Sequence, residues 1–171
     1  MHLRYDDVRK FGRMELVKTS EVENNPSIQK LGLEPDDARL DSDYLLSKFK
    51  NSKVNAKLGL LDQTIINGLG NIYANEVLYA TGISPFRPVN EITKKEAESI
   101  VLESGRITDA AYKAGGSTIR SYTSSLGVTG HYQDEIMVHG KEGKPCPKCG
   151  DAIKRAKIEG RSAYYCENCQ K

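Results

Sequence analysis

The stretch LLDQTIINGLGNIYANEVLYATG, residues 60–82, decides the fold because two helical patterns meet in it at a glycine-rich turn. Gly68 and Gly70 interrupt the helical spacing, which resumes at Ile72. A helix that starts here presents unpaired N–H groups and the positive end of its dipole. Asn71 can act as the N-cap or add a side-chain donor. The stretch therefore predicts a helix–turn–helix corner, which is either an ordinary turn or an anion site.

Helical patterns flank this corner on both sides. The first predicted helix is capped by Asp41 or Ser42, and the next two cover about 54–61 and about 71–80. The fourth runs from the capping box at Thr93 to Glu96 until Gly115 and Gly116. Pro85 and Pro88 prevent the third helix from continuing. The middle of the chain is therefore expected to be mainly α.

The first forty residues have a different pattern. Residues 3–19 alternate roughly as a strand, with Val8, Met14 and Leu16 as the apolar positions. Residues 20–40 are polar and contain two prolines, which predicts a linker with a short helical turn near 27–31. Because one strand cannot satisfy its own backbone, we expect that its partner strands lie upstream of this sequence.

The four cysteines form two Cys-x2-Cys pairs separated by sixteen residues, and they are Cys146, Cys149, Cys166 and Cys169. Four thiolates in this spacing are typical of tetrahedral zinc bound by two knuckles. The intervening residues predict a β-hairpin that turns at Glu159 and Gly160. One structural Zn²⁺ is the expected cofactor, and disulfides or an iron–sulfur cluster are the alternatives.

Composition and charge narrow the class of protein. The chain has 171 residues with a formal net charge of +2, and 38% of them are hydrophobic. It contains no apolar run of the ~20 residues that a membrane span needs, and no signal-peptide pattern. We therefore expect a cytoplasmic, monomeric protein that does not enter a membrane. Residues 138–171 hold eight Lys or Arg against four acidic residues, so the cysteine-rich end is basic.

Three features together indicate a nucleic-acid backbone as the partner. Residues 117–135 form a long Ser-, Thr- and Gly-rich segment without periodicity, and loops of this length are often functional. Arg161 follows the turn of the predicted hairpin, where its planar guanidinium can bind a phosphate. The glycine corner supplies a second anion site.

Several motifs, in this order along the chain, resemble the formamidopyrimidine-DNA glycosylase family, which excises oxidised purines such as 8-oxoguanine and formamidopyrimidines from damaged duplex DNA. They are DDVRKFG (6–12), LLDQTIINGLGNIYANEVLYATGISPFRP (60–88), GGSTIRSYTSSLGVTGHYQ (115–133) and CPKCGDAIKRAKIEGRSAYYCENCQ (146–170). The resemblance covers essentially the whole chain. It implies a helix-two-turn-helix bundle followed by a β-hairpin zinc finger, preceded by a remnant of an N-terminal β-sandwich.

The resemblance also implies domain bounds and residue roles. The sandwich remnant and linker would span 1–35, the helical domain 36–135 with a lesion-recognition loop at 116–133, and the zinc finger 136–171. Phosphates around the lesion would be bound by Lys57, Asn71 and Arg161. Arg9 and Phe11 would fill the space left by an extruded nucleotide, although pattern alone favours a core position for Phe11. The extruded base would be recognised by Ser117, Thr118, Ile119, Arg120, Ser121 and Tyr122.

One departure from the family bears on catalysis. The resemblance implies that the family attacks the sugar with an N-terminal proline aided by the adjacent glutamate, whereas this sequence begins MHLRYDD. No catalytic residue is therefore expected in these 171 residues, which should bind damaged double-stranded DNA without cleaving it.

Three other interpretations remain open. The chain can be a non-enzymatic zinc-finger DNA-binding module, or part of an endonuclease VIII-like glycosylase for oxidised pyrimidines. A zinc-ribbon protein of the transcription or translation machinery would explain the cysteines but not the other motifs.

Overall fold

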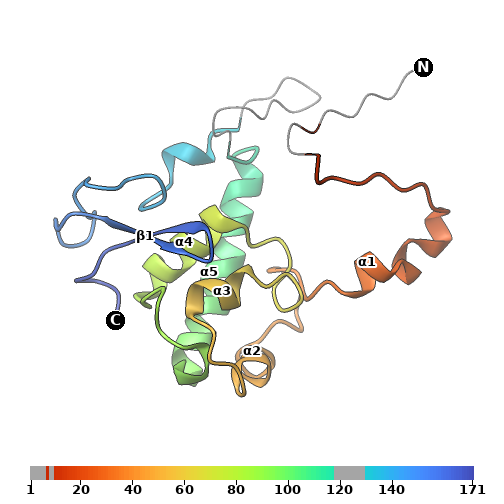
Figure 1. Ribbon diagram of the computed structural model, residues 1–171, viewed down its shortest axis with the longest axis horizontal. Coiled ribbons are helices and arrows are strands. Elements are labelled where there is room, and N and C mark those ends of the chain that lie inside the picture. Colours follow the sequence, from red (N-terminus) through yellow and green to blue (C-terminus); the bar gives the residue numbers. More distant parts are fainter. Residues whose placement is uncertain (1–6, 8–9, 118–129) are drawn as a thin grey trace. The chain divides into compact units, whose positions relative to one another are not determined.

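The computed structural model describes residue 7, residues 10–117 and residues 130–171 (Figure 1). The chain divides into a unit of residues 1–30 and a larger unit of residues 31–171, and each has its own internal contacts. Among the described residues, no helix combines the length and the apolar character that crossing a bilayer requires.

The first unit contains two short helices and no strand in its described part. A 3-10 helix η1 spans Thr19–Asn24, and α1 spans Pro26–Gln29, close to the predicted turn. The predicted strand over residues 3–19 is wrong for the residues described there. Phe11 is 81% exposed and Leu16 is 100% exposed, so neither is a core residue of this unit. A strand needs backbone partners, and the described part of the unit offers none.

Four α-helices form the centre of the larger unit, as predicted. They are α2 (Ser42–Phe49), α3 (Ala56–Leu61), α4 (Asn71–Thr81) and α5 (Lys94–Lys113), with the short 3-10 helices η2 (Val89–Glu91) and η3 (Tyr132–Asp134) beside them. Asp41 caps α2 by accepting a hydrogen bond from Tyr44 N at 2.7 Å. Thr93 and Glu96 form the predicted capping box of α5. The helix ends are therefore set by local residues that the sequence identifies.

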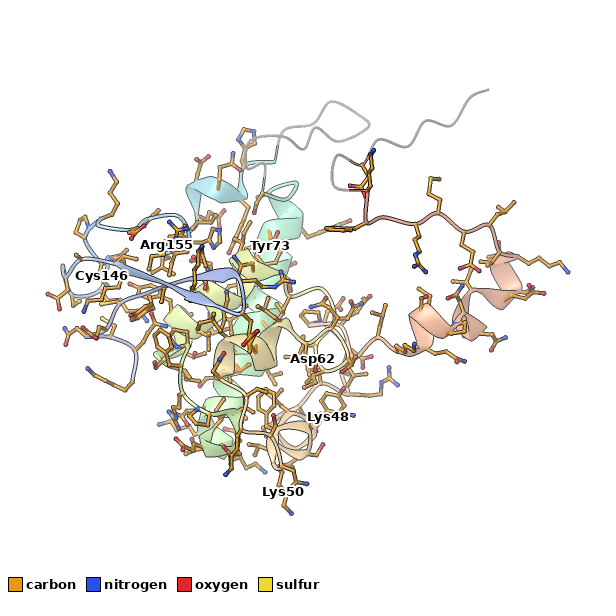
Figure 2. All side chains as sticks on the ribbon, viewed as in Figure 1. Lys48, Lys50, Asp62, Tyr73, Cys146 and Arg155 are labelled. Atoms are coloured by element: carbon orange, nitrogen blue, oxygen red, sulfur yellow. The ribbon has the colours of Figure 1, made fainter. Side chains whose placement is uncertain are left out.

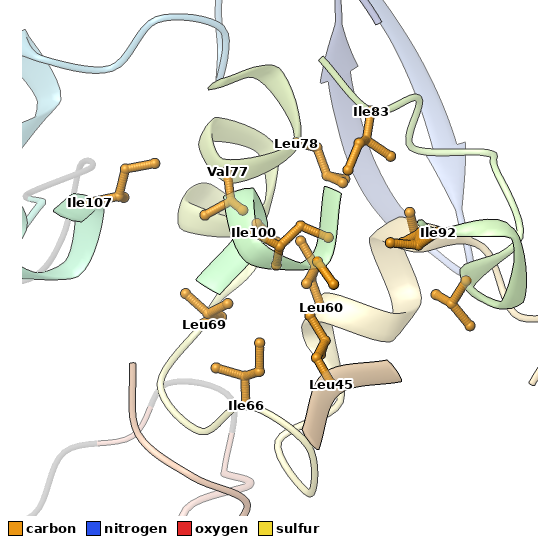
Figure 3. Packing of buried hydrophobic residues seen from close by; sticks show 14 of the residues in the cluster. Leu45, Leu60, Ile66, Leu69, Val77, Leu78, Ile83, Ile92, Ile100 and Ile107 are labelled. Atoms are coloured by element: carbon orange, nitrogen blue, oxygen red, sulfur yellow. The ribbon is translucent and has the colours of Figure 1, made fainter. Parts of the chain in front are cut away.

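The core lies where α5 packs against α2 and α4. Figure 3 shows Ile100 of α5 near Val77 of α4 and Leu60 of α3, and all three side chains are buried. Leu45 of α2 belongs to the same cluster. This packing fixes α4 at the centre of the larger unit, with one end of the helix at the glycine-rich turn.

The side chain of Gln63 spans the turn between α3 and α4. Gln63 Nε2 donates to Leu61 O at 3.1 Å and to Leu69 O at 3.0 Å. Gln63 Oε1 accepts from Gly68 N at 2.9 Å, and Gly68 has a φ of 87° that favours glycine. The turn is thus a fixed structure that presents the first residues of α4 in one orientation.

A two-stranded antiparallel hairpin forms the C-terminal part of the larger unit. Strand β1 (Lys154–Ile158) pairs with β2 (Arg161–Tyr165), with Ile158 opposite Arg161. Glu159 and Gly160 both have positive φ, at 46° and 74°, which is the backbone of a tight hairpin turn and confirms the predicted turn. The hairpin lies beside α4 in Figure 1, and β2 is the strand in contact with that helix.

Candidate nucleic-acid interface

The N-terminus of α4 has an unpaired polar atom. Gly70 is the N-cap and offers no side-chain bond, so of the two expected roles of Asn71 the N-cap role is wrong. Asn71 is instead the first helical residue, and its Oδ1 is buried with no hydrogen-bond partner among the described residues. A buried polar atom without a partner costs about 1–3 kcal/mol. The oxygen can accept a bond only from a donor, whereas the Nδ2 of the same amide can donate to an anion.

Lys57 lies behind this helix end. Its side chain is 0% exposed, and its Nζ donates to Asn71 O at 2.9 Å and to Asn75 Oδ1 at 2.6 Å. Burial and then the positive charge of Arg161 lower the pKa of Lys57 to about 7, against an opposing effect of Glu76. The ammonium has three donors, so two are used here and one remains.

Arg161 is exposed at the start of β2. Its charge acts on Lys57, which is bonded to the backbone of Asn71. The three phosphate-binding candidates of the sequence therefore occur in one neighbourhood, where the hairpin packs on α4. Two cationic side chains and the positive end of a helix dipole make this neighbourhood attractive to an anion.

A buried polar network supports this neighbourhood, and the sequence analysis missed its members. Glu76 accepts backbone N–H groups of Met137, Val138 and His139 at 2.7, 3.1 and 2.8 Å. Asn75, next to Glu76, is also buried. The only available signal was two adjacent polar residues within an otherwise apolar helical pattern, and that pattern does not reveal their partners.

The four cysteines converge as predicted, and Cys146 lies beside the hairpin in Figure 2. Their sulfur atoms all lie within 4.8 Å of one another. Cys146 Sγ is 3.8 Å from Cys169 Sγ, and Cys149 Sγ is 3.5 Å from Cys166 Sγ. Four Zn–S bonds of ~2.3 Å in a tetrahedron place sulfurs ~3.8 Å apart, so this donor set fits one structural Zn²⁺.

The zinc-binding segment is anchored to the other end of α4. Lys148 Nζ donates to Tyr79 O at 3.0 Å and to Ala80 O at 3.1 Å, which places a cation at the negative end of the helix dipole. Tyr79 packs in a small cluster with Cys146, Cys166 and their neighbours, and its hydroxyl is 3.2 Å from Cys146 Sγ. The metal site is therefore attached to the helix that carries Asn71.

The remaining site candidates lie partly outside the described residues. Ser117 is described, pairs with His131 in an isolated bridge, and has a buried Oγ without a partner in the described part of the chain. Thr118, Ile119, Arg120, Ser121 and Tyr122 are outside it, as is Arg9. Phe11 belongs to the first unit, where it is exposed.

Comparison with protein families gives two matches. A model described as the formamidopyrimidine-DNA glycosylase H2TH domain matches residues 31–123. A model described as a zinc finger found in FPG and IleRS matches residues 143–171. The two matches cover the helical core and the hairpin with its cysteines.

Individual proteins and structures are similar over nearly the whole chain. The formamidopyrimidine-DNA glycosylases of Lactobacillus delbrueckii and Desulforamulus reducens are 41% and 42% identical over 169 residues, which are 99% of this chain. The chain spans 62% and 61% of those proteins. The Lactococcus lactis Fpg in complex with DNA containing an abasic site has a TM-score of 0.89 and 39% identity, over 96% of this chain and 60% of that one. MutM from Thermus thermophilus has a TM-score of 0.89 and 36% identity, over 96% and 62%.

Proposed function

Because the chain belongs to the formamidopyrimidine-DNA glycosylase family, whose members are DNA glycosylases, we propose that it is the DNA-binding part of a base-excision-repair enzyme. The whole protein would be a glycosylase and AP lyase for oxidised purines in duplex DNA. A solved relative of similar fold is bound to DNA with an abasic site, which supports this partner. The protein would then act with the nucleoid in a bacterial cytoplasm.

The observation that carries the proposal is the arrangement at the N-terminus of α4. Asn71 begins the helix there and its amide Nδ2 is a hydrogen-bond donor, Lys57 holds its ammonium against the backbone of the same residue, and the charge of Arg161 acts on this ammonium. We call Lys57, Asn71 and Arg161 the phosphate clamp. A DNA phosphate would accept hydrogen bonds from the clamp and offset the repulsion between its two cations.

The zinc site has a structural role in this proposal. All four ligands are cysteines, so the metal has no open position for substrate. Zinc would hold the hairpin together and thereby hold Arg161 at the clamp. Arg9 and Phe11 would fill the duplex, and residues 117–122 would close on the extruded base, as the family resemblance implies.

The first test is whether a polypeptide of these 171 residues binds DNA without cleaving it. Fluorescence anisotropy is expected to show salt-dependent binding to a duplex that contains a stable abasic-site analogue, with weaker binding to undamaged duplex. Borohydride treatment on natural abasic DNA is expected to give no covalent adduct, because the family nucleophile is not among these residues. A full-length relative with its N-terminal proline serves as the positive control.

Each part of this test has a contradicting result. A covalent adduct formed by the 171 residues would show that they carry an amine nucleophile of their own. Absence of binding even at low salt would contradict the DNA-binding proposal. With the whole protein, faster excision of oxidised pyrimidines than of oxidised purines would favour an endonuclease VIII-like specificity instead.

DNA affinity should fall as the pH rises above neutral. The pKa of Lys57 is about 7 in the free protein, below its ordinary value of 10.5, so this lysine is only partly charged near neutral pH. A bound phosphate favours the ammonium, so binding takes up a proton between the pKa of the free protein and the higher pKa of the complex. Affinity is expected to fall by at most about tenfold per pH unit in that window.

Anisotropy titrations at constant salt between pH 6 and pH 9 measure this effect. Lys57→Met should bind more weakly at pH 6 and lose most of the pH dependence. The matched control is Lys50→Met, which removes an exposed lysine at the end of α2. This control should keep the pH dependence of binding. Equal pH dependence in Lys57→Met and in the unsubstituted protein would exclude Lys57 as its origin.

A further inference from the structure

Asn75 occupies an unusual position in the core. It lies on α4 one turn after Asn71 and is 1% exposed. Its Oδ1 accepts from Lys57 Nζ at 2.6 Å and from Tyr164 N at 3.4 Å. Its Nδ2 lies 2.7 Å from His139 Nδ1. One carboxamide thus joins α3, the segment before the zinc site and strand β2.

The partners fix the orientation of this amide. Two donors face the oxygen of Asn75, so the nitrogen must point to His139. An amide nitrogen only donates, so His139 Nδ1 accepts and the ring proton is on Nε2. Burial and the charge of Lys57 lower the pKa of His139 to about 4, which keeps the ring neutral near pH 7. We call the contacts of the Asn75 carboxamide with Lys57, Tyr164 and His139 the Asn75 junction, and all of them can form at neutral pH.

The other neighbours of His139 hold it in the same place. Its ring packs edge-on against the ring of Tyr164, with centroids 5.0 Å apart. Its backbone N–H donates to the carboxylate of Glu76 at 2.8 Å. The cation of Arg155 also lies over the Tyr164 ring, 5.8 Å from its centre. His139 therefore connects Asn75 to the side chain of Tyr164 in the hairpin and to Glu76 of α4.

Strand β2 carries this connection to the phosphate clamp. Tyr164 and Arg161 belong to the same five-residue strand, which is paired with β1 along its whole length. Whatever fixes Tyr164 against α4 also fixes Arg161 relative to Lys57. The side chain of Asn75 accepts a hydrogen bond from the backbone of Tyr164 and another from the ammonium of Lys57.

We propose that Asn75 is a positioning residue, whose carboxamide sets the separation between Lys57 and Arg161 so that one DNA backbone can meet both. The proposal rests on the proposed function of the clamp. Asn75 itself would not bind DNA in this proposal, because its carboxamide already faces Lys57, Tyr164 and His139. Its replacement would change DNA binding only through the residues that it holds.

The first experiment is a double-mutant cycle in DNA binding. Asn75→Ala is expected to lower affinity by roughly tenfold, because it removes a hydrogen bond to a buried ammonium. If Asn75 acts by placing Arg161, the two substitutions should not be additive. The loss of binding free energy in the double variant Asn75→Ala with Arg161→Ala should be smaller than the sum of the losses in the single variants. Ser104→Ala is the matched control, since it alters a buried polar side chain of α5 that has no partner among the described residues.

The second experiment measures the contact between residue 75 and His139. It does not require the alanine variant to fold. Asn75→Asp keeps an acceptor for Lys57 but turns the contact with His139 into one that needs a proton on Nδ1, carried by the other neutral tautomer or by the charged ring. The pKa of His139, followed by nitrogen NMR, should rise from its lowered value in this variant because a carboxylate favours the charged ring. The chain has three histidines, so the signal can be assigned. The new carboxylate also raises the pKa of Lys57, so the fall in DNA affinity with pH should begin at a higher pH in Asn75→Asp than in the unsubstituted protein.

The outcomes separate this inference from the proposed function. If Lys57→Met and Arg161→Ala weaken binding while Asn75→Ala binds normally, the positioning role is wrong and the clamp stands. Fully additive losses in the double variant, or an unchanged pKa of His139 in Asn75→Asp, would also overturn the role. If the unsubstituted chain does not bind DNA at all, the proposed function itself fails.

Discussion

Removing zinc with a strong chelator is expected to unfold residues 143–171 and to abolish specific DNA binding by the chain. An isolated two-stranded hairpin is marginal in water, and the buried cluster around Cys146 and Ile153 is small. Structural zinc in small fingers supplies about 10–16 kcal/mol of folding free energy at neutral pH. Without the metal, the hairpin that carries Arg161 would lose its fixed place on α4.

Limited proteolysis and circular dichroism measure this effect. New cleavage sites should appear between residues 143 and 171, while helices α2 to α5 stay protected, because their core is formed by other side chains. Adding zinc back should restore both protection and DNA binding. An unchanged cleavage pattern in a sample shown by metal analysis to contain no zinc would contradict the structural role.

A matched pair of variants separates metal loss from general damage to the hairpin. Cys166→Ser removes a buried ligand and should reproduce the effect of the chelator. Ser162→Ala changes a neighbouring residue of β2 that is not a ligand and should retain zinc. Loss of zinc from both variants would mean that damage to the hairpin, and not removal of the Cys166 thiolate, prevents metal binding.

Replacing Arg161 with alanine is expected to lower DNA affinity by about tenfold or more and to reduce the salt slope by about one ion. Arg161 is exposed at the start of β2, so its loss removes few protein contacts. A charged, bidentate hydrogen bond to a phosphate is worth more than a neutral one. The loss should therefore occur in DNA binding and not in stability.

Two further variants test the chemistry of this contact. Arg161→Lys keeps the charge but loses the planar fork, so it should restore most of the salt slope and only part of the affinity. Lys157→Ala removes another exposed cation of the hairpin, on β1, and should have a smaller effect. Anisotropy titrations at several salt concentrations give both quantities. A salt slope that is the same with and without Arg161 would argue against phosphate binding by this residue.

The Arg161→Ala variant also has a consequence at Lys57. The charge of Arg161 is one cause of the lowered pKa of Lys57, so its removal should raise that pKa. The fall in DNA affinity with pH should then begin at a higher pH in Arg161→Ala than in the unsubstituted protein. This shift provides a check on the proximity of the two cations that does not depend on the loss of affinity.

Local sequence was sufficient for most of the fold. The caps at Asp41 and Thr93 and the two-residue turn at Glu159 were predicted correctly, because each depends on residues within one turn of chain. The four cysteines were also predicted to converge, since their spacing alone fits a tetrahedral ion. For residue 7 and residues 10–19, the strand prediction is wrong, because alternation cannot supply a partner strand.

The sequence by itself determined the helices, the hairpin, the zinc ligands and the family, because these follow from short-range spacing and from motifs. Only the tertiary structure decided that Lys57 is enclosed and that Asn75 joins it to His139 and Tyr164. These partners are 18, 64 and 89 positions from Asn75 along the chain. Hydrogen bonds across such separations depend on how α4 packs against α3 and the hairpin, which periodicity does not encode.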